Sequence, residues 1–390
     1  MTRTPSLFDD IIPDAPPTEG IKYAGSKLKL LPSILELVKR TGAKTVLDGF
    51  AGSTRVSQAF ARSGYQVISN DINVWSKVFA TCYLMSELPA NAYVDLIRHL
   101  NAVKPYEGWF TAHYGSLPDS EMATSKRPWQ RHNTMKLDGI REEIDNLKLP
   151  EVERCVALTS LILAMDKVDS TMGHFVSYLR DWSPRSYNQM ILQVPHLIQS
   201  AGQHRVFNDD VFNLAGVDVD LAYFDPPYGS NNEKMPPSRV RYASYYHVWT
   251  TLCLNDKPTL FGKASRRTDT SDVVSASVFE EFRKNDMTGR FIAVESIQRL
   301  LTSTAAKWIV LSYSSGGRAT AEDLNAAISM AGEVVELVEV DYKRNVMAGM
   351  KWTNDWIRDI DEPNREFLFL IANTNRVGDK KRQNNGLRNG

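Results

Sequence analysis

The chain has 390 residues, and 46 lysine and arginine residues balance 46 aspartate and glutamate residues, so the formal net charge is zero. At about 150 residues per domain, this length predicts two domains, or one large domain that carries an insertion. The balanced charge excludes a uniformly basic protein that coats nucleic acid, so any polyanion must be met by a local patch of charge.

The predicted elements alternate between short strands and amphipathic helices. Residues 1–20 contain four prolines and few apolar anchors, which predicts a disordered arm. Helical periodicity follows the first apolar run at Val56 and Phe60, and the second at Val74 and Val78. The apolar runs predict strands at residues 44–48, 65–69, 219–224, 307–312, 333–340 and 366–371. This alternation predicts an α/β fold with a doubly wound, mainly parallel sheet.

Two stretches interrupt the alternation. Residues 85–204 are largely helical, and residues 229–286 are polar and aromatic. Both are expected at the carboxyl ends of strands, where open α/β sheets bind ligands. We therefore expect an arm, a main domain in two parts, a helical insertion and a flexible basic tail, at residues 1–20, 21–84 with 205–372, 85–204 and 373–390.

The first predicted strand leads through Asp48-Gly-Phe-Ala-Gly-Ser-Thr54 into a helix. Its small residues let the backbone approach a ligand, and the turn presents helix N-terminal amides. Asp71 closes the second strand about 20 residues further on, the spacing of an acidic ribose-binding residue. The pattern fits an adenosine cofactor, although the dinucleotide fingerprint is absent. A tight turn that binds nothing, with Asp71 as a cap, is an equally good interpretation.

Asp225-Pro-Pro-Tyr228 follows the strand predicted at 219–224. The two prolines rigidify the turn and hold the Asp225 carboxylate and the Pro226 carbonyl side by side as acceptors. Two fixed acceptors suit the two N–H donors of an exocyclic amine, and Tyr228 is placed to stack on the base. The alternative is a stiff loop in which Asp225 caps a helix and Tyr228 only packs.

These motifs resemble those of the DNA adenine-N6 methyltransferases that use S-adenosylmethionine. The family's D-x-F-x-G-S-G motif is similar to residues 48–54, its upstream lysine-rich segment is similar to Lys22-Tyr-Ala-Gly-Ser-Lys27, and its D-P-P-Y is unaltered. The motif order resembles the Dam-like, or alpha, group, and the likeness extends over residues 21–372, including segments 311–315, 342–344 and 365–371. One departure is Thr54, where the family usually has glycine.

The resemblance implies a Rossmann-like methyltransferase fold in which residues 85–204 recognise the DNA target. It implies a cytoplasmic enzyme of a bacterial, archaeal or phage-infected cell, which methylates a flipped adenine at N6 in duplex DNA. Such an enzyme belongs to a restriction–modification system, with a separate cognate endonuclease, or is a solitary or phage methylase. The catalytic residues would be Asp225, Pro226, Pro227 and Tyr228. S-adenosylmethionine would be bound by Tyr23, Gly25, Lys27, Asp48, Phe50, Gly52, Ser53, Asp71 and Asp209.

Two choices within this set have alternatives. Asp209 is preferred over Asp210, for which a helix N-cap is the alternative role. A cytosine-N4 methyltransferase would use the same chemistry, but those enzymes usually carry serine before Pro-Pro, so Asp225 favours adenine. A DNA-binding module with a degenerate site is the alternative from another class, and intact Asp225 and Tyr228 argue against it.

Basic clusters are the expected contacts to DNA phosphates, which position a duplex without reading its sequence. The candidates are Lys126, Arg127, Arg131, Arg239, Arg241, Arg266, Arg267, Lys343 and Arg344. A solvated face is the alternative for each cluster. The three cysteines form no CxxC pair and HExxH is absent, so we expect no metal. No run of about 18 apolar residues occurs, so we expect no membrane span.

Overall fold

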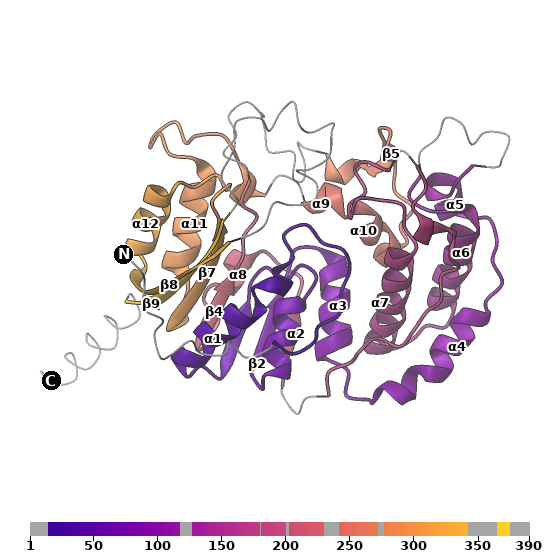
Figure 1. Ribbon diagram of the computed structural model, residues 1–390, viewed down its shortest axis with the longest axis horizontal. Coiled ribbons are helices and arrows are strands. Elements are labelled where there is room, and N and C mark those ends of the chain that lie inside the picture. The colour runs from indigo at the N-terminus through magenta and orange to yellow at the C-terminus, as the bar shows by residue number, and fades with distance from the viewer. Residues whose placement is uncertain are drawn as a thin grey trace, which may run out of the picture.

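The computed structural model describes residues 15–117, 127–179, 181–199, 203–229, 242–271, 277–341 and 365–374. Among these residues, a seven-stranded sheet forms the centre of the molecule (Figure 1). Its strands are β1 (Thr45–Asp48), β2 (Gln66–Asn70), β3 (Arg205–Phe207), β4 (Leu221–Phe224), β7 (Trp308–Ser314), β8 (Gly332–Asp341) and β9 (Arg365–Asn373). A small second sheet pairs β5 (Leu260–Phe261) with β6 (Arg266–Arg267).

Helices cover the sheet and extend beyond it. They are α1 (Leu31–Thr41), α2 (Arg55–Arg62), α3 (Val74–Leu84), α4 (Val94–Ala102), α5 (Trp109–Tyr114), α6 (Arg131–Asn146), α7 (Glu151–Lys167), α8 (Val211–Leu214), α9 (Tyr242–Tyr245), α10 (His247–Leu254), α11 (Ile292–Ser303) and α12 (Ala321–Ser329). Short 3-10 turns are η1 (Lys27–Lys29), η2 (Ala90–Tyr93), η4 (Pro184–Tyr187), η5 (Thr268–Thr270) and η6 (Val278–Glu280). Within the described ranges, no helix is both long and apolar enough to span a bilayer.

The strand order is β3-β2-β1-β4-β7-β9-β8. β1 pairs in parallel with β2 and β4, and β4 pairs in parallel with β7. β9 runs antiparallel to its neighbours β7 and β8. The chain moves outward from β1 on one side and from β4 on the other, so the order reverses between these two strands. The mostly parallel sheet confirms the predicted α/β architecture, and such a reversal is where open sheets bind ligands.

All six predicted strands are present, and the last two close the sheet as the pair β8 and β9. β3 was not predicted. It has three residues, none of them fully buried, and it lies at the edge of the sheet beside β2. A three-residue edge strand is too short to show a period of two in the sequence.

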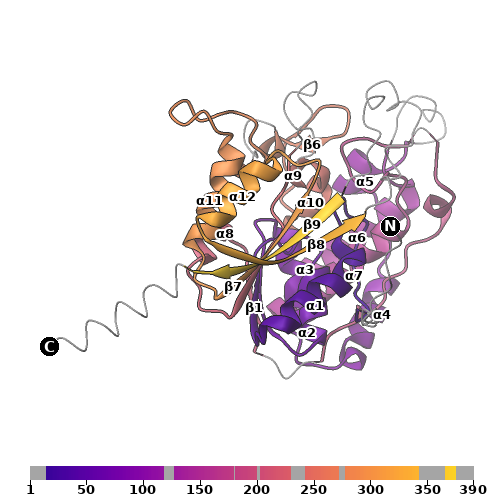
Figure 2. The same cartoon turned by 60° about the vertical axis from the view of Figure 1, so that its left-hand side comes forward.

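Side chains alternate between two apolar cores, one on each face of the sheet. Val46 and Val310 point to the core that includes residues of α1, α2 and α3. Leu47 and Leu311 point to the core that includes residues of α11 and α12. Figure 2 shows these two groups of helices on opposite sides of the strands. The sheet is therefore buried on both faces, which explains its runs of apolar residues.

Helices α4 to α7 lie between α3 and β3 in the chain, and at the opposite end of the molecule from β8 and β9 (Figure 1). α7 packs against α3 and is buried around its whole circumference from Cys155 to Met165, not along one face only. Phe79 of α3 and Leu158 of α7 belong to the same apolar core. These helices therefore extend the core of the sheet domain, and a separate target-recognition unit at residues 85–204 stays a prediction.

The predicted arm and tail need correction at their inner ends. Arg55 of α2 donates hydrogen bonds to the carbonyls of Thr18 (2.7 Å) and Gly20 (3.2 Å), so these residues are fixed against the fold. Asn373 ends β9, and its Nδ2 donates to the carbonyls of Thr304 (2.7 Å) and Ala306 (2.9 Å). Both predicted boundaries lay in polar sequence, where a few specific hydrogen bonds fix the chain without an apolar pattern. Residues 1–14 and 375–390 lie outside the described residues.

Candidate active site

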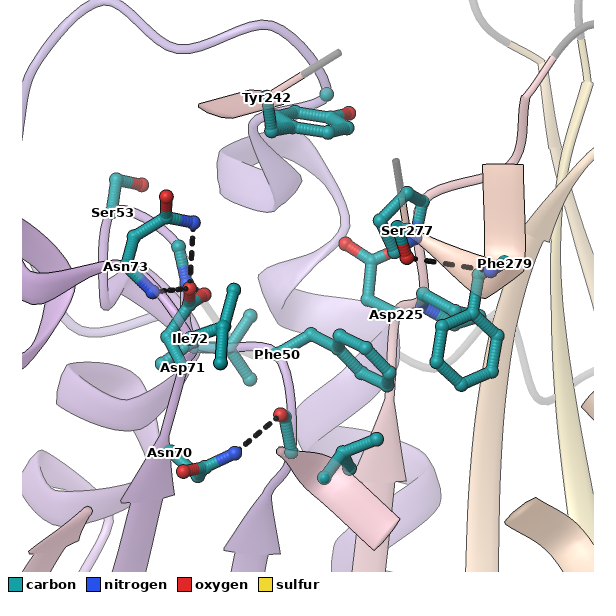
Figure 3. A pocket seen from close by; sticks show the side chains of 18 of the residues that line it. Phe50, Ser53, Asn70, Asp71, Ile72, Asn73, Asp225, Tyr242, Ser277 and Phe279 are labelled. Atoms are coloured by element: carbon teal, nitrogen blue, oxygen red, sulfur yellow. Dashed lines mark hydrogen bonds between the residues drawn. The ribbon is translucent and has the colours of Figure 1, made fainter. Parts of the chain in front are cut away.

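A cavity of about 390 Å³ opens at the carboxyl ends of β1 and β4, where the strand order reverses. Every residue predicted to act in catalysis or to bind the cofactor lines this cavity, with the exception of Asp48. Figure 3 shows Asp71 and Asp225 on opposite sides of it, with Phe50 between them and Tyr242 above. The fold thus brings together motifs that are about 200 residues apart in the chain.

Gly52 allows the loop after β1 to close against Tyr23. Its φ of 49° lies in the left-handed region, and a Cβ atom there would lie 3.0 Å from the Tyr23 hydroxyl. The Gly52 N–H donates to Asp71 Oδ2 over 2.8 Å. Both the conformation and the close contact therefore require glycine at this position.

Thr54 also has a left-handed backbone, with φ 61° and ψ 11°. This conformation is unfavourable for a β-branched residue. The Thr54 side chain is fully buried, and its hydroxyl accepts a hydrogen bond from Gln58 Nε2 at 3.0 Å. The loop therefore keeps the conformation that glycine would adopt, although the residue differs from the family's usual one.

Asp71 follows β2 and organises the loop as well as facing the cavity (Figure 3). Its Oδ1 accepts hydrogen bonds from the backbone and side-chain amides of Asn73, each at 2.8 Å. Burial raises the pKa of Asp71, and its hydrogen bonds oppose this shift. The N-cap of α3 is Asn73, so Asp71 is not the cap that the alternative interpretation required.

Asp48 does not reach the cavity, and the prediction that it contacts the cofactor is corrected. Its side chain is fully buried, and Oδ2 accepts a hydrogen bond from Ser57 Oγ at 2.6 Å. Strand alternation places Asp48 on the same face of β1 as Val46, beneath α2. Burial raises the pKa of Asp48 to about 7, and the hydrogen bond from Ser57 opposes this shift. Asp48 therefore supports the loop from behind.

Asp209 and Asp210 line the cavity beside α8. Asp210 accepts the Phe212 N–H at 3.0 Å and is the N-cap of α8, as its alternative interpretation predicted. Asp209 Oδ1 accepts from Asn213 Nδ2 at 2.9 Å. Asn70 was missed by the sequence analysis. Its Nδ2 donates to the Asp209 carbonyl at 3.1 Å and its Oδ1 accepts the Asp209 N–H at 3.1 Å, which joins β2 to this segment.

Phe50 and Phe279 form an apolar wall of the cavity. Their ring centroids are 5.3 Å apart with the planes at 88°, and Phe279 stacks on Phe212 with centroids 5.6 Å apart. Ser277 Oγ accepts the Phe279 N–H at 3.3 Å (Figure 3). Aromatic surfaces of this kind suit the flat face of a base. Phe279 was missed because it lies in a polar stretch with no recognised motif.

Tyr23 anchors the upstream segment in an aromatic cluster. Its ring stacks on Tyr246 at 4.8 Å and lies 5.8 Å from Trp75. Gly25 has φ 79°, and a Cβ atom there would lie 2.9 Å from the hydroxyl of Tyr242. These contacts hold the segment from Tyr23 to Gly25 tightly against Tyr242 and Tyr246 at the cavity.

Asp225 and Tyr228 form the chemical centre with Lys27. The Tyr228 hydroxyl donates a hydrogen bond to Asp225 Oδ1. Lys27 Nζ lies 3.1 Å from the same carboxylate oxygen and 2.6 Å from the Tyr228 hydroxyl oxygen. Burial raises the pKa of Asp225, and the Lys27 ammonium and the Tyr228 hydroxyl oppose this shift. Lys27, whose side chain is 5% exposed, is therefore the counter-ion of Asp225.

Ser312 of β7 and Glu366 of β9 complete this cluster, and neither was predicted as a site residue. Ser312 Oγ and Glu366 Oε2 each lie 3.2 Å from the hydroxyl oxygen of Tyr228. Both residues lie in late segments covered by the family resemblance, at 311–315 and 365–371. That position was the available signal, but only the sheet shows which side chains of these segments face Asp225.

The sequence profile of the D12 class N6 adenine-specific DNA methyltransferases matches residues 23–288. The chain belongs to this family. The match runs from Tyr23 through the loop after β1 and the helices α4 to α7, and past Asp225-Pro-Pro-Tyr228.

Curated relatives of this D12-family chain are named as a modification methylase and as type II methyltransferases. The chain is 27% identical over 346 residues to the modification methylase StsI of Streptococcus sanguinis. This alignment covers 83% of this chain and 48% of StsI. It is 23% identical over 334 residues to the type II methyltransferase M.NlaIII of Neisseria lactamica, covering 83% and 92%. It is 26% identical over 336 residues to M.CviAII of Paramecium bursaria Chlorella virus 1, and the alignment again covers 83% of this chain and 92% of the relative. The chain thus spans about half the length of the first relative and most of the other two.

The basic residues predicted to contact DNA lie in different environments in this D12-family member. Arg131 forms an ion pair with Glu107. Arg127 Nη1 donates to the carbonyl of His113 at 3.0 Å. Arg266 donates to the Ser244 hydroxyl and to the carbonyl of Thr270 in η5. Five further candidates lie outside the described residues: Lys126, Arg239, Arg241, Lys343 and Arg344.

The prediction that Arg267 contacts a DNA phosphate is wrong. Its side chain is 4% exposed, and its guanidinium forms ion pairs at 2.7 Å with both Asp256 and Asp269. Nη1 also donates to Thr251 Oγ1 at 3.3 Å. A buried guanidinium that is neutralised by two carboxylates fixes the loop after α10, and it does not present its N–H groups to a DNA backbone.

Proposed function

We propose that this protein transfers a methyl group from S-adenosylmethionine to the N6 amine of an adenine extruded from duplex DNA. The observation that carries the proposal is that the loop after β1 and Asp225-Pro-Pro-Tyr228 face one cavity at the switch point of the sheet. Membership of the D12 family agrees with this geometry.

The residues around the cavity fit S-adenosylmethionine. Asp71 offers carboxylate acceptors for ribose hydroxyls beside the glycine-containing loop. Phe50 and Phe279 offer an apolar wall for the adenine, with Asp209 at its margin. Tyr23, Gly25, Lys27 and Ser53 also line the cavity, and Lys27 contacts Asp225, so the methionine end of the cofactor would lie beside these residues.

The target adenine must leave the base stack, because N6 in a duplex is committed to base pairing. The Asp225 carboxylate and the Pro226 carbonyl accept the two N6 hydrogens and orient the nitrogen. The Tyr228 ring supports the base while its hydroxyl holds Asp225. S-adenosylmethionine supplies an electrophilic methyl group when bound. The chain therefore acts by positioning and electrostatics, and it needs no covalent intermediate with the protein.

We further propose that the helices of residues 85–204 recognise the DNA target and that the protein serves as a modification methylase beside a cognate restriction endonuclease. Two observations support this: the family is named for its action on DNA, and the curated relatives are named as a modification methylase and a type II methyltransferase.

The test is to methylate DNA of mixed sequence with the purified protein and to map the modified bases. We expect N6-methyladenine within one short sequence. Asp225→Ala should lose at least about 100-fold in transfer rate, since it removes an acceptor that positions N6, while duplex binding is retained. Production of N4-methylcytosine without N6-methyladenine would overturn the proposal, and so would full activity of Asp225→Ala.

A further inference from the structure

Glu366 places a second carboxylate beside the catalytic motif. It lies on β9, opposite Ser314 of β7, and its side chain is 12% exposed. Glu366 Oε2 lies 3.4 Å from Lys27 Nζ and 3.2 Å from the Tyr228 hydroxyl oxygen. β9 follows Tyr228 by more than 130 residues, so only the antiparallel strand order brings this carboxylate into the site.

One ammonium group is therefore shared by two carboxylates. Lys27 Nζ contacts Asp225 at 3.1 Å and Glu366 at 3.4 Å, and its side chain is 5% exposed. With all three groups ionised, the cluster carries a net charge of one negative unit. Without Glu366, Lys27 would neutralise Asp225 and the cluster would carry no net charge. Buried charges are screened weakly, so this difference acts strongly on a charged ligand nearby.

We propose, on the basis of the proposed function, that Glu366 is a positioning residue that takes up the charge of Lys27. When ionised, Asp225 then offers the N6 hydrogens a carboxylate whose charge Lys27 does not fully neutralise, and the cavity favours the sulfonium cation of S-adenosylmethionine over the neutral sulfur of S-adenosylhomocysteine. The same negative charge stabilises the positive charge that develops on N6 during transfer.

The surroundings of the cluster agree with this role. Burial raises the pKa of Glu366, and the Lys27 ammonium opposes the shift. Other titratable groups that interact with Asp225 or Glu366 are the phenols of Tyr23, Tyr223, Tyr228 and Tyr242 and the carboxylate of Asp48. Among the described groups named here, Lys27 is the one cation, so the charge balance depends on it.

The first test compares cofactor binding in wild type and Glu366→Gln by calorimetry. We expect the affinity for S-adenosylmethionine to fall about tenfold and that for S-adenosylhomocysteine to change less than about twofold, because one unit of charge near the sulfur is lost. Glu339→Gln is the matched control. Glu339 lies on the neighbouring strand β8 and pairs with Arg365 at the surface, so both affinities should stay at the wild-type values.

The double variant Lys27→Met with Glu366→Gln separates charge from packing. It leaves Asp225 as the single ionised group of the cluster and restores the net negative charge, so the preference for S-adenosylmethionine over S-adenosylhomocysteine should return toward the wild-type ratio. Glu366→Asp, which keeps the charge, should retain the preference as well. If Glu366→Gln keeps the wild-type ratio, or if both rescue variants fail to restore it, the proposed charge role is wrong.

The pH dependence of single-turnover methylation gives a second readout. In Glu366→Gln, Asp225 no longer shares Lys27 with another anion, so the acid limb of the profile should move to lower pH while the maximal rate falls. A purely structural role would lower the rate without moving the limb. If the wild-type protein methylates no DNA, the proposed function fails, whereas the cofactor-binding ratio still tests Glu366 by itself.

Discussion

Asp48 shows at the residue scale how burial converts a motif carboxylate into a titrating group. Its pKa is raised from 3.8 to about 7, mainly by burial. Between these values the folded protein holds one more proton than the unfolded chain, so the free energy of unfolding decreases as the pH rises. The contribution of a single group is at most about 1.4 kcal/mol per pH unit. Above about pH 7 Asp48 is ionised in both the folded and the unfolded state, so it no longer makes the free energy of unfolding depend on pH.

We expect Asp48→Asn to remove this pH dependence. Urea unfolding of wild type and variant at several pH values from 5 to 8 measures it. The wild type should lose stability relative to the variant as the pH rises from 5 to 7, and the difference should be constant above that. Other buried carboxyls, such as Asp166 with a pKa of about 6, titrate in both proteins and cancel in the comparison. A difference that does not vary with pH would show that Asp48 is ionised throughout.

Thr54 tests the cost of a left-handed backbone at a β-branched residue. Thr54→Gly and Thr54→Ala both delete the hydroxyl that binds Gln58. Glycine also relieves the steric conflict at φ 61°, whereas alanine keeps its Cβ atom. We therefore expect the glycine variant to be about 1 kcal/mol more stable than the alanine variant in chemical denaturation. Equal stabilities, or a more stable alanine variant, would mean that the loop relaxes to another conformation.

Arg267 acts at the scale of elements. It belongs to β6 and ties η5, through Asp269, to the residues after α10, through Asp256. Replacing it with methionine leaves two partly exposed carboxylates without their shared cation and removes the hydrogen bond to Thr251, which together should cost about 1–2 kcal/mol. We expect Arg267→Met to lower the thermal unfolding temperature and to leave the salt dependence of DNA binding unchanged. A shallower salt dependence with normal stability would restore Arg267 as a phosphate contact.

The strands show which elements could be predicted and why. β1, β2, β4 and β7 are buried on both faces and carry apolar runs, so their positions follow from the sequence. β3 at the exposed edge has no such run. The antiparallel direction of β9 depends on its pairing with β7 and β8, which no local pattern encodes.

The charge balance belongs to the scale of the whole molecule. Forty-six positive and 46 negative side chains cancel, so the molecule as a whole has no net attraction to DNA. Several cations are already committed within the fold, among them Lys22 with Asp169 (2.9 Å) and Arg185 with Asp169 (2.7 Å). The proposed binding of DNA therefore requires that some of the remaining cations gather in one part of the surface.

We expect the affinity for duplex DNA to fall by about tenfold or more between 50 and 200 mM salt, because forming phosphate contacts releases counterions from the DNA. Fluorescence anisotropy with a labelled duplex measures it. Arg131→Ala should reduce the slope of log affinity against log salt if its guanidinium exchanges Glu107 for a phosphate. An affinity independent of salt would contradict a phosphate-mediated interface.

The sequence by itself determined the strand pattern, the glycine-containing loop, Asp71, Asp225 and Tyr228, because these depend on local conformation and on motifs contiguous in the chain. Only the tertiary structure decided which way the side chains point. It removed Asp48 and Arg267 from the predicted ligand contacts, added Phe279 to the cavity wall, and placed Glu366 beside Lys27. The physical reason is that strand alternation and long-range pairing set burial and charge, and Lys27, Asp225 and Glu366 meet on three separate segments that only the sheet brings together.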